Sequence, residues 1–371
     1  MLSVRNVTVL NYRIECARIA GIIKEIWYYR QKKRKKKANK YVPNRISHIM
    51  KIGFDLMGSD SAPKNEIETL RLLKEDPVAD LVVSGKGDYE NDAIELGFEF
   101  RLADEVIGMH EIPSVAIRQK KNSSLSILMN LLKKKELDAV VSAGNTGAIL
   151  GLSMITLGKI EGVAKAGLAI TLPAESGYSV MIDVGANINP KSIDYFNYGL
   201  MGSILATIIL GKKDPRAAIL NIGTERVKGD EVRQKAYQIL RESDLNFIGN
   251  IEGNNIMKGF ADVIISDGFT GNVILKLLEG IIDPLWHMLR EKVDAVARRK
   301  FGQFLVKPAI KDLKARFNYE EYGGGILLGT EGVVIICHGH SSPQALRNAI
   351  KLAKICVEYN MVEKIRERIN K

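Results

Sequence analysis

Residues 138–148 read DAVVSAGNTGA, a short apolar run that passes directly into a loop of small residues. The run over 138–142 is rich in small and β-branched residues and too short for a helix, so it predicts a buried strand. Gly144, Asn145 and Thr146 predict a turn whose backbone N–H groups crowd together at the start of a helix. Such a turn can bind an anion, because the N-terminus of a helix carries a partial positive charge. The alternative interpretation is an ordinary strand-to-helix turn with an N-cap residue.

The same order of strand, Gly-rich loop and helix recurs along the chain after Met50. Residues 66–74 predict a helix, and six further apolar runs predict strands: 51–55, 79–84, 180–182, 217–222, 261–266 and 332–337. Strands that alternate with helices favour a mostly parallel sheet with helices on both faces. The sequence therefore predicts the α/β class, with a ligand site at the carboxyl ends of the strands.

The loops that follow these strands supply the candidate binding residues. Each loop alone is common turn chemistry, but together they describe an anion site built from backbone N–H groups, side-chain amides and hydroxyls. The candidates are Asp55, Gly58, Gly144, Asn145, Thr146, Gly185, Asn187, Asn221, Gly223, Asp267, Gly268 and Asn272. For the first loop, helix capping explains the sequence equally well.

Lys228, Lys276 and His338 are the candidates for charge balance and proton transfer. Lys228 is the one cation among these loops, and Lys276 follows the last Gly-rich loop by about one helical turn. His338 comes directly after the last predicted strand, and an imidazole there can transfer a proton. The alternatives are an ordinary surface lysine and a histidine that only orders its loop.

The net charge of +11 is confined to one end of the chain. Residues 1–50 contain 13 of the 54 Lys and Arg residues but only two of the 43 Asp and Glu residues. Residues 51–371 therefore contain 41 basic and 41 acidic residues. The neutral body argues against a nucleic-acid partner. We expect residues 1–49 to be a basic extension that is disordered, or to precede a true start at Met50. A basic tail can also bind RNA or anionic lipid, and residues 14–29 can form an amphipathic helix on a membrane surface.

Several function classes lack their sequence signature. No GxGxxG follows the first strand, as a dinucleotide site would need, and neither HExxH nor CxxC suggests zinc. The GxSxG elbow of serine hydrolases is absent. No run of 18 apolar residues predicts a membrane span, and residues 1–29 lack a signal-peptide pattern. The three cysteines are far apart, which fits a reducing cytoplasm.

Seven segments, in this order, resemble the bacterial phosphate acyltransferases of phospholipid synthesis. They are DLMGSDSAP (55–63), SAGNTGA (142–148), DVGANIN (183–189), NIGTERVKG (221–229), NFIGNIEG (246–253), DGFTGN (267–272) and GILLGTEGVVIICHG (325–339). The match covers residues 51–371. Two loops depart from the family pattern, because Ser59 and Ser61 replace Gly and His, and His340 stands in a loop that usually reads HGSSN.

The resemblance implies a three-layer α/β/α sandwich related to the phosphotransacetylases and the isocitrate dehydrogenase-like fold, a homodimer, and no metal or organic cofactor. It implies transfer of a fatty acyl chain from acyl carrier protein to inorganic phosphate, and the acyl phosphate would feed a glycerol-3-phosphate acyltransferase. Some relatives contact the anionic membrane through a helical hairpin. Here the hairpin maps to 273–300, within a helical arm over about 273–316 that we expect to be interrupted near 283–284 and 301–302. The alternative is that this apolar stripe packs in the dimer interface.

In that reaction, Asn145, Thr146 and Asn187 are expected to cradle phosphate, and Lys228 or Lys276 to balance its charge. His338 is expected to transfer a proton or to contact the carbonyl oxygen. Asp55 and Asp267 are expected to orient their loops, because a carboxylate beside phosphate is repulsive.

Three rival functions are open at this point. The nearest is a phosphate acetyl- or butyryltransferase that uses acyl-coenzyme A. A second is a metal- and nucleotide-dependent dehydrogenase of the same broad fold. The third is a nucleic-acid or membrane adaptor that acts through residues 14–40. We expect the enzyme in the cytoplasm, with peripheral contact to the inner face of the cell membrane as a possibility.

Overall fold

The computed structural model describes residues 50–175, 177–294, 310 and 323–370, which belong to the unit Met50–Lys371. The predicted N-terminal extension lies outside these residues. So do all but one of the residues in the second half of the predicted arm, from 295 to 316.

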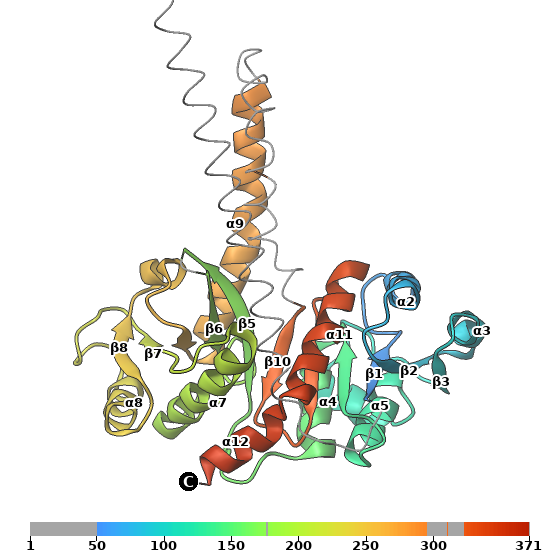
Figure 1. Ribbon diagram of the computed structural model, residues 1–371, viewed down its shortest axis with the longest axis horizontal. Coiled ribbons are helices and arrows are strands. Elements are labelled where there is room, and N and C mark those ends of the chain that lie inside the picture. The colour runs from blue at the N-terminus through green and yellow to red at the C-terminus, as the bar shows by residue number, and fades with distance from the viewer. Residues whose placement is uncertain (1–49, 176, 295–309, 311–322, 371) are drawn as a thin grey trace, which may run out of the picture. The chain divides into compact units, whose positions relative to one another are not determined.

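The described strands form one sheet in the order β3-β2-β1-β4-β11-β10-β5-β6-β9-β7-β8 (Figure 1). Their bounds are Lys51–Asp55 (β1), Asp80–Gly85 (β2), Glu99–Leu102 (β3), Ala139–Ser142 (β4), Gly167–Ala174 (β5), Gly177–Ile182 (β6), Ala217–Leu220 (β7), Phe247–Ile251 (β8), Val263–Ile265 (β9), Gly325–Leu328 (β10) and Val333–Ile336 (β11). In the first half of the sheet, Phe54 lies opposite Val83 of β2 and Val141 of β4. All three side chains lie on one face and are fully buried, and their neighbours Val82 and Val140, on the other face, are buried too, so the sheet is apolar on both faces here.

The two halves of the sheet run in opposite directions. Seven strand pairs are parallel, but β5 is antiparallel to both β6 and β10, and β10 is antiparallel to β11. As a result β6, β7, β8 and β9 run opposite to β1, β2, β3, β4 and β11. The predicted mostly parallel sheet is confirmed. The strands of the two halves, however, end at opposite sides of the sheet. The rule that places a ligand at the carboxyl ends of the strands assumes that all strands end on the same side.

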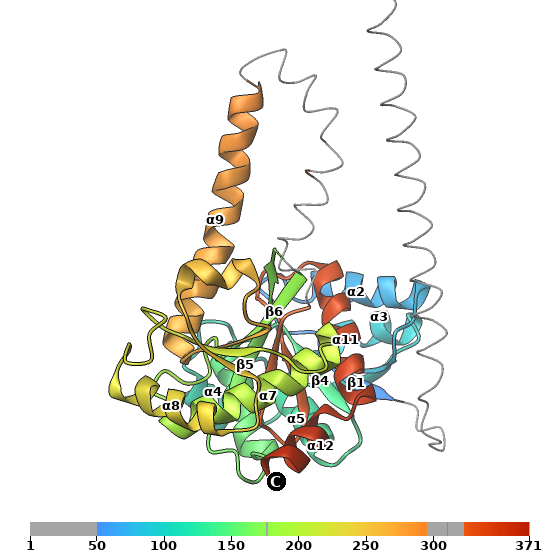
Figure 2. The same ribbon diagram turned by 60° about the vertical axis from the view of Figure 1, so that its left-hand side comes forward.

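Helices cover both faces and complete three layers (Figure 2). One face carries α2 (Lys64–Glu75), α3 (Glu90–Glu95), α7 (Ser192–Leu210), α8 (Glu231–Glu242), α11 (Pro343–Glu358) and α12 (Met361–Ile369). The other face carries α4 (Pro113–Gln119), α5 (Ser124–Lys133), α6 (Thr146–Leu152) and α9 (Gly268–Asp294). Short helical turns follow at Gly87–Tyr89 (η1), Ser153–Leu157 (η2) and Gly253–Lys258 (η3). The three-layer α/β/α sandwich is therefore confirmed.

Two helices need separate comment. α7 is long and apolar enough to cross a membrane by length and composition, but 67% of that apolar stretch is buried within the fold, as in a core helix. α9 continues through Pro284 without the break expected at 283–284. Proline removes the hydrogen bond to the carbonyl four residues earlier, which belongs to the exposed Gly280 and is free to bind water.

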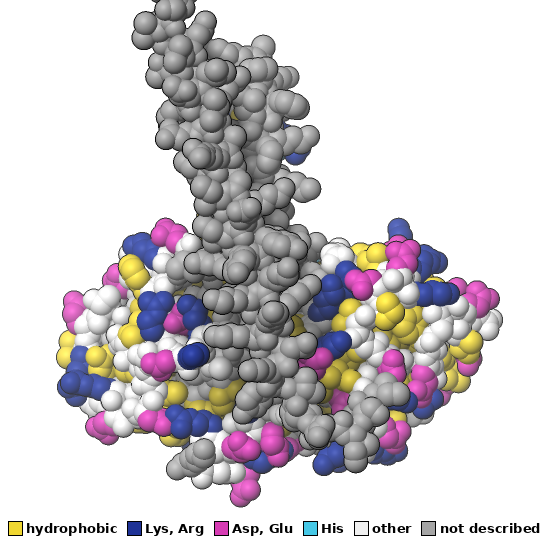
Figure 3. Space-filling view, viewed as in Figure 1, with side chains coloured by type: hydrophobic (Ala, Val, Ile, Leu, Met, Phe, Trp, Pro, Cys, Tyr) yellow, Lys and Arg dark blue, Asp and Glu magenta, His cyan; other side chains and the backbone are white. Residues whose placement is uncertain are grey.

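The seven predicted strands are all present, with ends shifted by up to three residues. Four strands were missed, namely β3, β5, β8 and β10. Figure 3 shows basic and acidic side chains interspersed on both flanks of the face in view. That pattern agrees with the balanced composition after residue 50.

Candidate active site

A cavity of roughly 400 Å³ lies beside the central strand β5. Leu168, Ile170 and Leu172 line it together, because alternate residues of a strand share one face. Its apolar wall is extended by Val184, Met257, Leu275, Leu278, Ile282 and Ile336. A largely apolar cavity with a few polar groups is the usual form of a small-molecule site.

Five of the predicted site residues line this cavity. They are Thr146, Gly185, Asn272, Lys276 and His338. Thr146 and His338 follow strands β4 and β11 in one half of the sheet. Gly185 follows β6 in the other half, and Asn272 and Lys276 lie on α9, which follows β9 in that half. The cavity thus runs along β5, and loops from both of the oppositely directed halves contribute to its wall.

His338, Lys276 and Glu279 are ionisable residues in the cavity wall. The Nε2 atom of His338 lies 3.2 Å from Nζ of Lys276, which also donates to Oε2 of Glu279 at 2.7 Å. Burial lowers the pKa of His338, and the neighbouring Lys276 ammonium lowers it further. The imidazole is therefore neutral near pH 7 and has a cation beside it. This arrangement suits an anion or a carbonyl oxygen that gains negative charge.

Asp55, at the end of β1, braces neighbouring elements. Its Oδ1 accepts hydrogen bonds from Ser124 Oγ at 2.7 Å and Met57 N at 3.0 Å, and its Oδ2 accepts one from Ser142 Oγ at 2.7 Å. Burial raises the pKa of this carboxyl, and the three donors oppose that rise. Asp55 therefore ties the first loop to α5 and β4 and lies outside the cavity lining.

Gly58 and Gly144 allow two loops to touch. A Cβ on Gly58 would lie 2.7 Å from the backbone nitrogen of Gly144, and a Cβ on Gly144 would lie 3.1 Å from Ser142 Oγ. Side chains at these positions would clash, so the two glycines serve a close backbone approach. Neither glycine lines the cavity.

Asn145 is the N-cap of α6. Its Oδ1 accepts from Ala148 N at 3.1 Å, and its Nδ2 donates to the carbonyl oxygens of Met109 and Glu111, both at 3.0 Å. The amide expected to cradle phosphate thus binds protein groups at both ends. The next residue, Thr146, is the one that reaches the cavity.

The carboxylate of Asp183 occupies the centre of the loop after β6. It accepts hydrogen bonds from the backbone N–H groups of Leu168 at 3.0 Å, Gly185 at 3.0 Å, Ala186 at 2.9 Å and Asn187 at 2.7 Å. Burial raises the pKa of Asp183, and these donors oppose the rise. The crowded N–H groups expected here do bind an anion, but that anion is the protein's own side chain.

The Asn187 side chain turns into the fold. Its Nδ2 donates to Tyr198 Oη at 3.0 Å and to the carbonyl oxygen of Ala166. Asn187 therefore positions its loop from within and lies outside the cavity lining, in contrast to the phosphate-binding role expected for it.

Gly268 and Asn272 bring the loop after β9 against the loop after β6. Gly268 N donates to the carbonyl oxygen of Asn187 at 2.7 Å, and a Cβ on Gly268 would lie 2.6 Å from that oxygen. One turn further along α9, the side-chain carboxamide of Asn272 lies 3.8 Å from the place of a Cβ on Gly185. This packing puts Asn272 and Gly185 side by side in the cavity wall.

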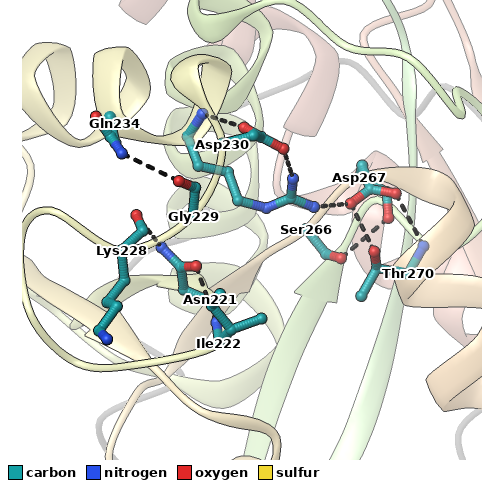
Figure 4. Close-up of polar contacts among 10 residues, drawn as sticks. Asn221, Ile222, Lys228, Gly229, Asp230, Gln234, Ser266, Asp267 and Thr270 are labelled. Carbon is teal, nitrogen blue, oxygen red and sulfur yellow. Dashed lines mark hydrogen bonds and ion pairs between the residues drawn. The ribbon is translucent and has the colours of Figure 1, made fainter.

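Asp267 caps the start of α9 and pairs with a residue that sequence reasoning missed, Arg233 of α8. Asp267 accepts from Thr270 N at 2.9 Å and Thr270 Oγ1 at 2.7 Å (Figure 4). Arg233 donates to the carboxylates of both Asp267 and Asp230. The side chains of Arg233 and Asp267 are only 19% and 8% exposed, so this pair joins α8 firmly to the start of α9.

The loop after β7 is closed by Asn221. Its Nδ2 donates to the carbonyl oxygen of Lys228 at 3.0 Å, and its Oδ1 accepts from Ile222 N at 2.8 Å. A Cβ on Gly223 would lie 2.8 Å from Cγ of Lys228. The exposed Lys228 side chain points away from Asp267 in Figure 4 and is not part of the cavity lining, unlike Lys276.

A second residue missed from the sequence is Glu66 of α2, which is fully buried behind the first loop. Its Oε1 accepts from Ser59 N at 3.1 Å, while its Oε2 has no hydrogen-bond partner among the described residues. Burial raises the pKa of Glu66 to about 7. Nothing in the local sequence marks this position, because burial of one helical glutamate depends on what packs over it.

The comparisons with known proteins agree with this arrangement. The family described as "Fatty acid synthesis protein" matches residues 50–364. The phosphate acyltransferase of Desulfitobacterium hafniense (strain Y51) is 39% identical over 328 residues, which cover 86% of this chain and 98% of that protein. The phosphate acyltransferase of Bacillus licheniformis is 41% identical over 325 residues, with coverages of 86% and 98%.

The fold also has solved counterparts. A phosphotransacetylase from Streptococcus pyogenes superposes with a TM-score of 0.55 at 15% sequence identity, covering 85% of this chain and 94% of that one. At this identity the likeness shows the fold alone, and it confirms the expected relation to the phosphotransacetylases. Given the family match over residues 50–364, and relatives about 40% identical along nearly their whole length that are acyltransferases named phosphate acyltransferase, the chain belongs to the fatty acid synthesis protein family.

Proposed function

We propose that this enzyme transfers a fatty acyl chain from acyl carrier protein to inorganic phosphate, and that the acyl phosphate serves the acylation of glycerol 3-phosphate. One observation carries the proposal. An apolar cavity of roughly 400 Å³ has Thr146, Asn272, Lys276 and His338 in its wall. The apolar part suits an alkyl chain, and the polar part suits phosphate and a thioester carbonyl.

In the proposed reaction, an oxygen of phosphate attacks the thioester carbonyl carbon. A C–O bond forms, the C–S bond breaks, and the carrier thiolate leaves with the electron pair of that bond. A thiol has a pKa of about 8.5, so the thiolate can leave without a strong acid and takes up a proton from water. The protein has to hold phosphate near the carbonyl and stabilise the charge that develops on its oxygen.

The cavity wall supplies both functions. Lys276 is the cation that lines the cavity, so it is assigned to phosphate together with the hydroxyl of Thr146 and the amide of Asn272. His338, neutral near pH 7, is assigned to the carbonyl oxygen or to proton transfer. Lys228, outside the cavity lining, receives no role in this assignment.

The direct test measures thiol release from long-chain acyl carrier protein with and without inorganic phosphate, with no metal or nucleotide added. Release that requires phosphate, together with a hydroxylamine-reactive product, would support the proposal. Release from short acyl-coenzyme A but not from acyl carrier protein would replace it with a phosphate acetyl- or butyryltransferase function. No release from either donor would reject both functions.

The exposed face of α9 suggests a further contact. Val273, Leu277, Ile281 and Leu285 recur at intervals of four residues and are 51%, 61%, 44% and 55% exposed. We propose that this face is covered in a homodimer, and that peripheral contact of a cytoplasmic enzyme with an anionic membrane uses the same arm. Leu277→Glu should convert a dimer to a monomer in light-scattering chromatography. An unchanged mass with lost flotation on anionic vesicles would favour the membrane contact instead.

A further inference from the structure

The central strand β5 extends past the beginning of its neighbour β10. The antiparallel ladder between them covers residues 167–169 of β5 and 326–328 of β10. On its other side, β5 remains paired with β6 as far as Ala174. Thr171, Leu172 and Pro173 therefore have no paired strand on the β10 side in the part of the chain that the structure describes. One edge of β5 is open over this stretch.

The backbone of Thr171 points to this open edge. Thr171 lies opposite Val180 of β6, but Val180 N donates away from β5, to the carbonyl oxygen of Asp262 at 2.9 Å. In an antiparallel ladder such a pair is not hydrogen-bonded, so the N–H and C=O of Thr171 face the other side. Ala169, two residues earlier, faces that side as well and meets Ile326 of β10 there. Among the described residues, Thr171 has no such ladder partner.

Two features of the sequence keep the edge open. Pro173 faces the same side as Thr171 and has no N–H, which is typical of a strand position without a partner. Directly before β10, Gly324 has a φ of +99°, outside the strand region, so the chain turns aside there. A Cβ on Gly324 would lie 2.6 Å from the carbonyl oxygen of Ile336. The backbone thus packs against β11 and leaves β5 uncovered.

The cavity beside β5 follows this open edge. It is lined by Ile170, Thr171, Leu172 and Pro173 in succession. Successive side chains of a strand point to opposite faces, so a cavity that meets four in a row runs along the edge of the strand. The same cavity reaches His338 and Lys276. The open edge and the ionisable residues of the proposed site are therefore parts of one cavity.

Inside a cavity, a backbone N–H or C=O without a hydrogen-bond partner is costly, so this edge suits an occupant with a donor and an acceptor on an extended chain. A fatty acyl chain has neither group, and phosphate is assigned to Lys276. The arm that carries the thiol of acyl carrier protein has both, because amide groups are spaced along it and the first lies two methylene groups from the sulfur. Such an arm can pair with a strand edge as a peptide does in strand addition.

We propose that the backbone N–H and C=O of Thr171 bind the amide nearest the sulfur of the acyl donor, and so place the thioester beside His338 and Lys276. The identity of the donor rests on the proposed function. Coenzyme A carries the same arm, so both kinds of acyl donor would use the edge in the same way.

The first test uses the wild-type protein and three thioesters of one fatty acid. Their thiols are N-acetylcysteamine, which has the amide, 2-acetoxyethanethiol, in which an ester replaces it, and pentanethiol, in which methylene groups do. The value of kcat/KM should fall by about threefold to tenfold from the amide to the ester and again from the ester to the alkyl donor, as expected for loss of one hydrogen bond at each step. Equal values for the three donors would overturn the proposal.

Two variants test the residue itself. Thr171→Pro removes the N–H, and Thr171→Val is the reference, because it removes the side-chain hydroxyl but keeps the N–H. Relative to Thr171→Val, Thr171→Pro should lower kcat/KM for the N-acetylcysteamine donor by about threefold to tenfold and change it less than twofold for the pentanethiol donor. The same loss with both donors would contradict binding of the amide by this N–H.

Stability shows whether the edge is open. Ala169→Pro removes an N–H that faces β10 within the ladder, so its urea midpoint should fall well below that of the wild type. Thr171→Pro should keep a midpoint close to that of Thr171→Val, because the N–H that it removes has no ladder partner. If Thr171→Pro is destabilised as much as Ala169→Pro, the N–H is paired within the fold and the proposal fails.

A measurement without turnover separates this site from the reaction. Saturation-transfer NMR with pantetheine, the arm alone, should show contact with the wild type and a loss of most of that contact in Thr171→Pro. Equal contact in both proteins would place the arm elsewhere. Absence of phosphate-dependent thiol release would reject the proposed function, and the pantetheine spectra would still decide whether β5 binds the arm. Where release is seen, acyl carrier protein and acyl-coenzyme A as donors show which carrier delivers the arm.

Discussion

Replacing Glu66 by glutamine should stabilise the protein at neutral and alkaline pH and have little effect at pH 4.5. The side chain is fully buried, and its Oε2 has no hydrogen-bond partner among the described residues. Burial raises its pKa from 4.5 to about 7. The folded protein therefore binds a proton at Glu66 more tightly than the unfolded chain does.

The sign and size follow from this difference in pKa. Below pH 4.5 the carboxyl is protonated in both states, and it has no effect on the pH dependence of stability. Between pH 4.5 and 7 the unfolded chain loses its proton first, so the free energy of unfolding falls as the pH rises. This difference in pKa corresponds to about 3 kcal/mol once both states are ionised.

Glutamine keeps the acceptor for Ser59 N and cannot ionise. Its NH₂ group takes the place of the unpartnered oxygen, much as the hydroxyl of a protonated carboxyl would, so Glu66→Gln should match the wild type within about 1 kcal/mol at pH 4.5. Above pH 8 the variant should be more stable by about 3 kcal/mol.

Urea unfolding followed by circular dichroism at pH 4.5, 6, 7 and 8.5 measures the gap directly. Glu68→Gln is the control on the same helix, because Glu68 is exposed and forms a surface ion pair with Arg71. Its gap to the wild type should stay constant with pH. If the gap for Glu66→Gln also stays constant, the carboxyl is not held in its neutral form by burial and the reasoning fails.

Three further changes test other parts of the structure. Lys276→Ala should raise the apparent KM for phosphate about 10-fold, because it removes a cation from the cavity wall, whereas Lys228→Ala should change it less than twofold; equal effects in a phosphate titration would contradict the assignment. Arg233→Met should lower the free energy of unfolding by about 2 to 4 kcal/mol at pH 7, since it leaves Asp267 buried without its partner, and denaturant unfolding with an unchanged midpoint would contradict that. Leu172→Trp should fill part of the cavity and lower kcat/KM for long acyl chains while sparing short ones, by about fourfold for each methylene that is displaced; a uniform loss across a donor series would mean that the chain binds elsewhere.

The strands that follow a simple rule could be predicted from the sequence. Runs such as 51–55 and 138–142 are short, apolar and followed by small residues, so their identity as buried parallel strands needed no tertiary information. β5 was missed because its sequence does not alternate clearly between apolar and polar residues. Leu168, Ile170 and Leu172 alternate with Ala169, Thr171 and Pro173, and of these three only Thr171 is polar. β10 was missed because it is short and flanked by glycines. These two are the strands that reverse the direction of the sheet, so the opposite orientation of its halves could not be foreseen.

The candidate site was only partly predictable for a different reason. The sequence shows which loops are rich in N–H donors and amides, but not whether those groups are already used within the protein. Asn145 and Asn187 look like ligands by residue type, and both are committed to backbone carbonyls. Arg233 lies 34 residues from Asp267, and no local pattern links the two.

The loop that encloses Asp183 is complete before any substrate arrives. In a loop that becomes ordered only when phosphate binds, the entropy lost by the backbone weakens the binding free energy. Here that ordering is achieved during folding, so Gly185 can act as a rigid template for whatever enters the cavity. A glycine-rich loop in a sequence can thus have N–H groups that are open to a ligand, or N–H groups that already bind a side chain of the protein. In this loop, the aspartate at its first position, Asp183, is the residue that binds them.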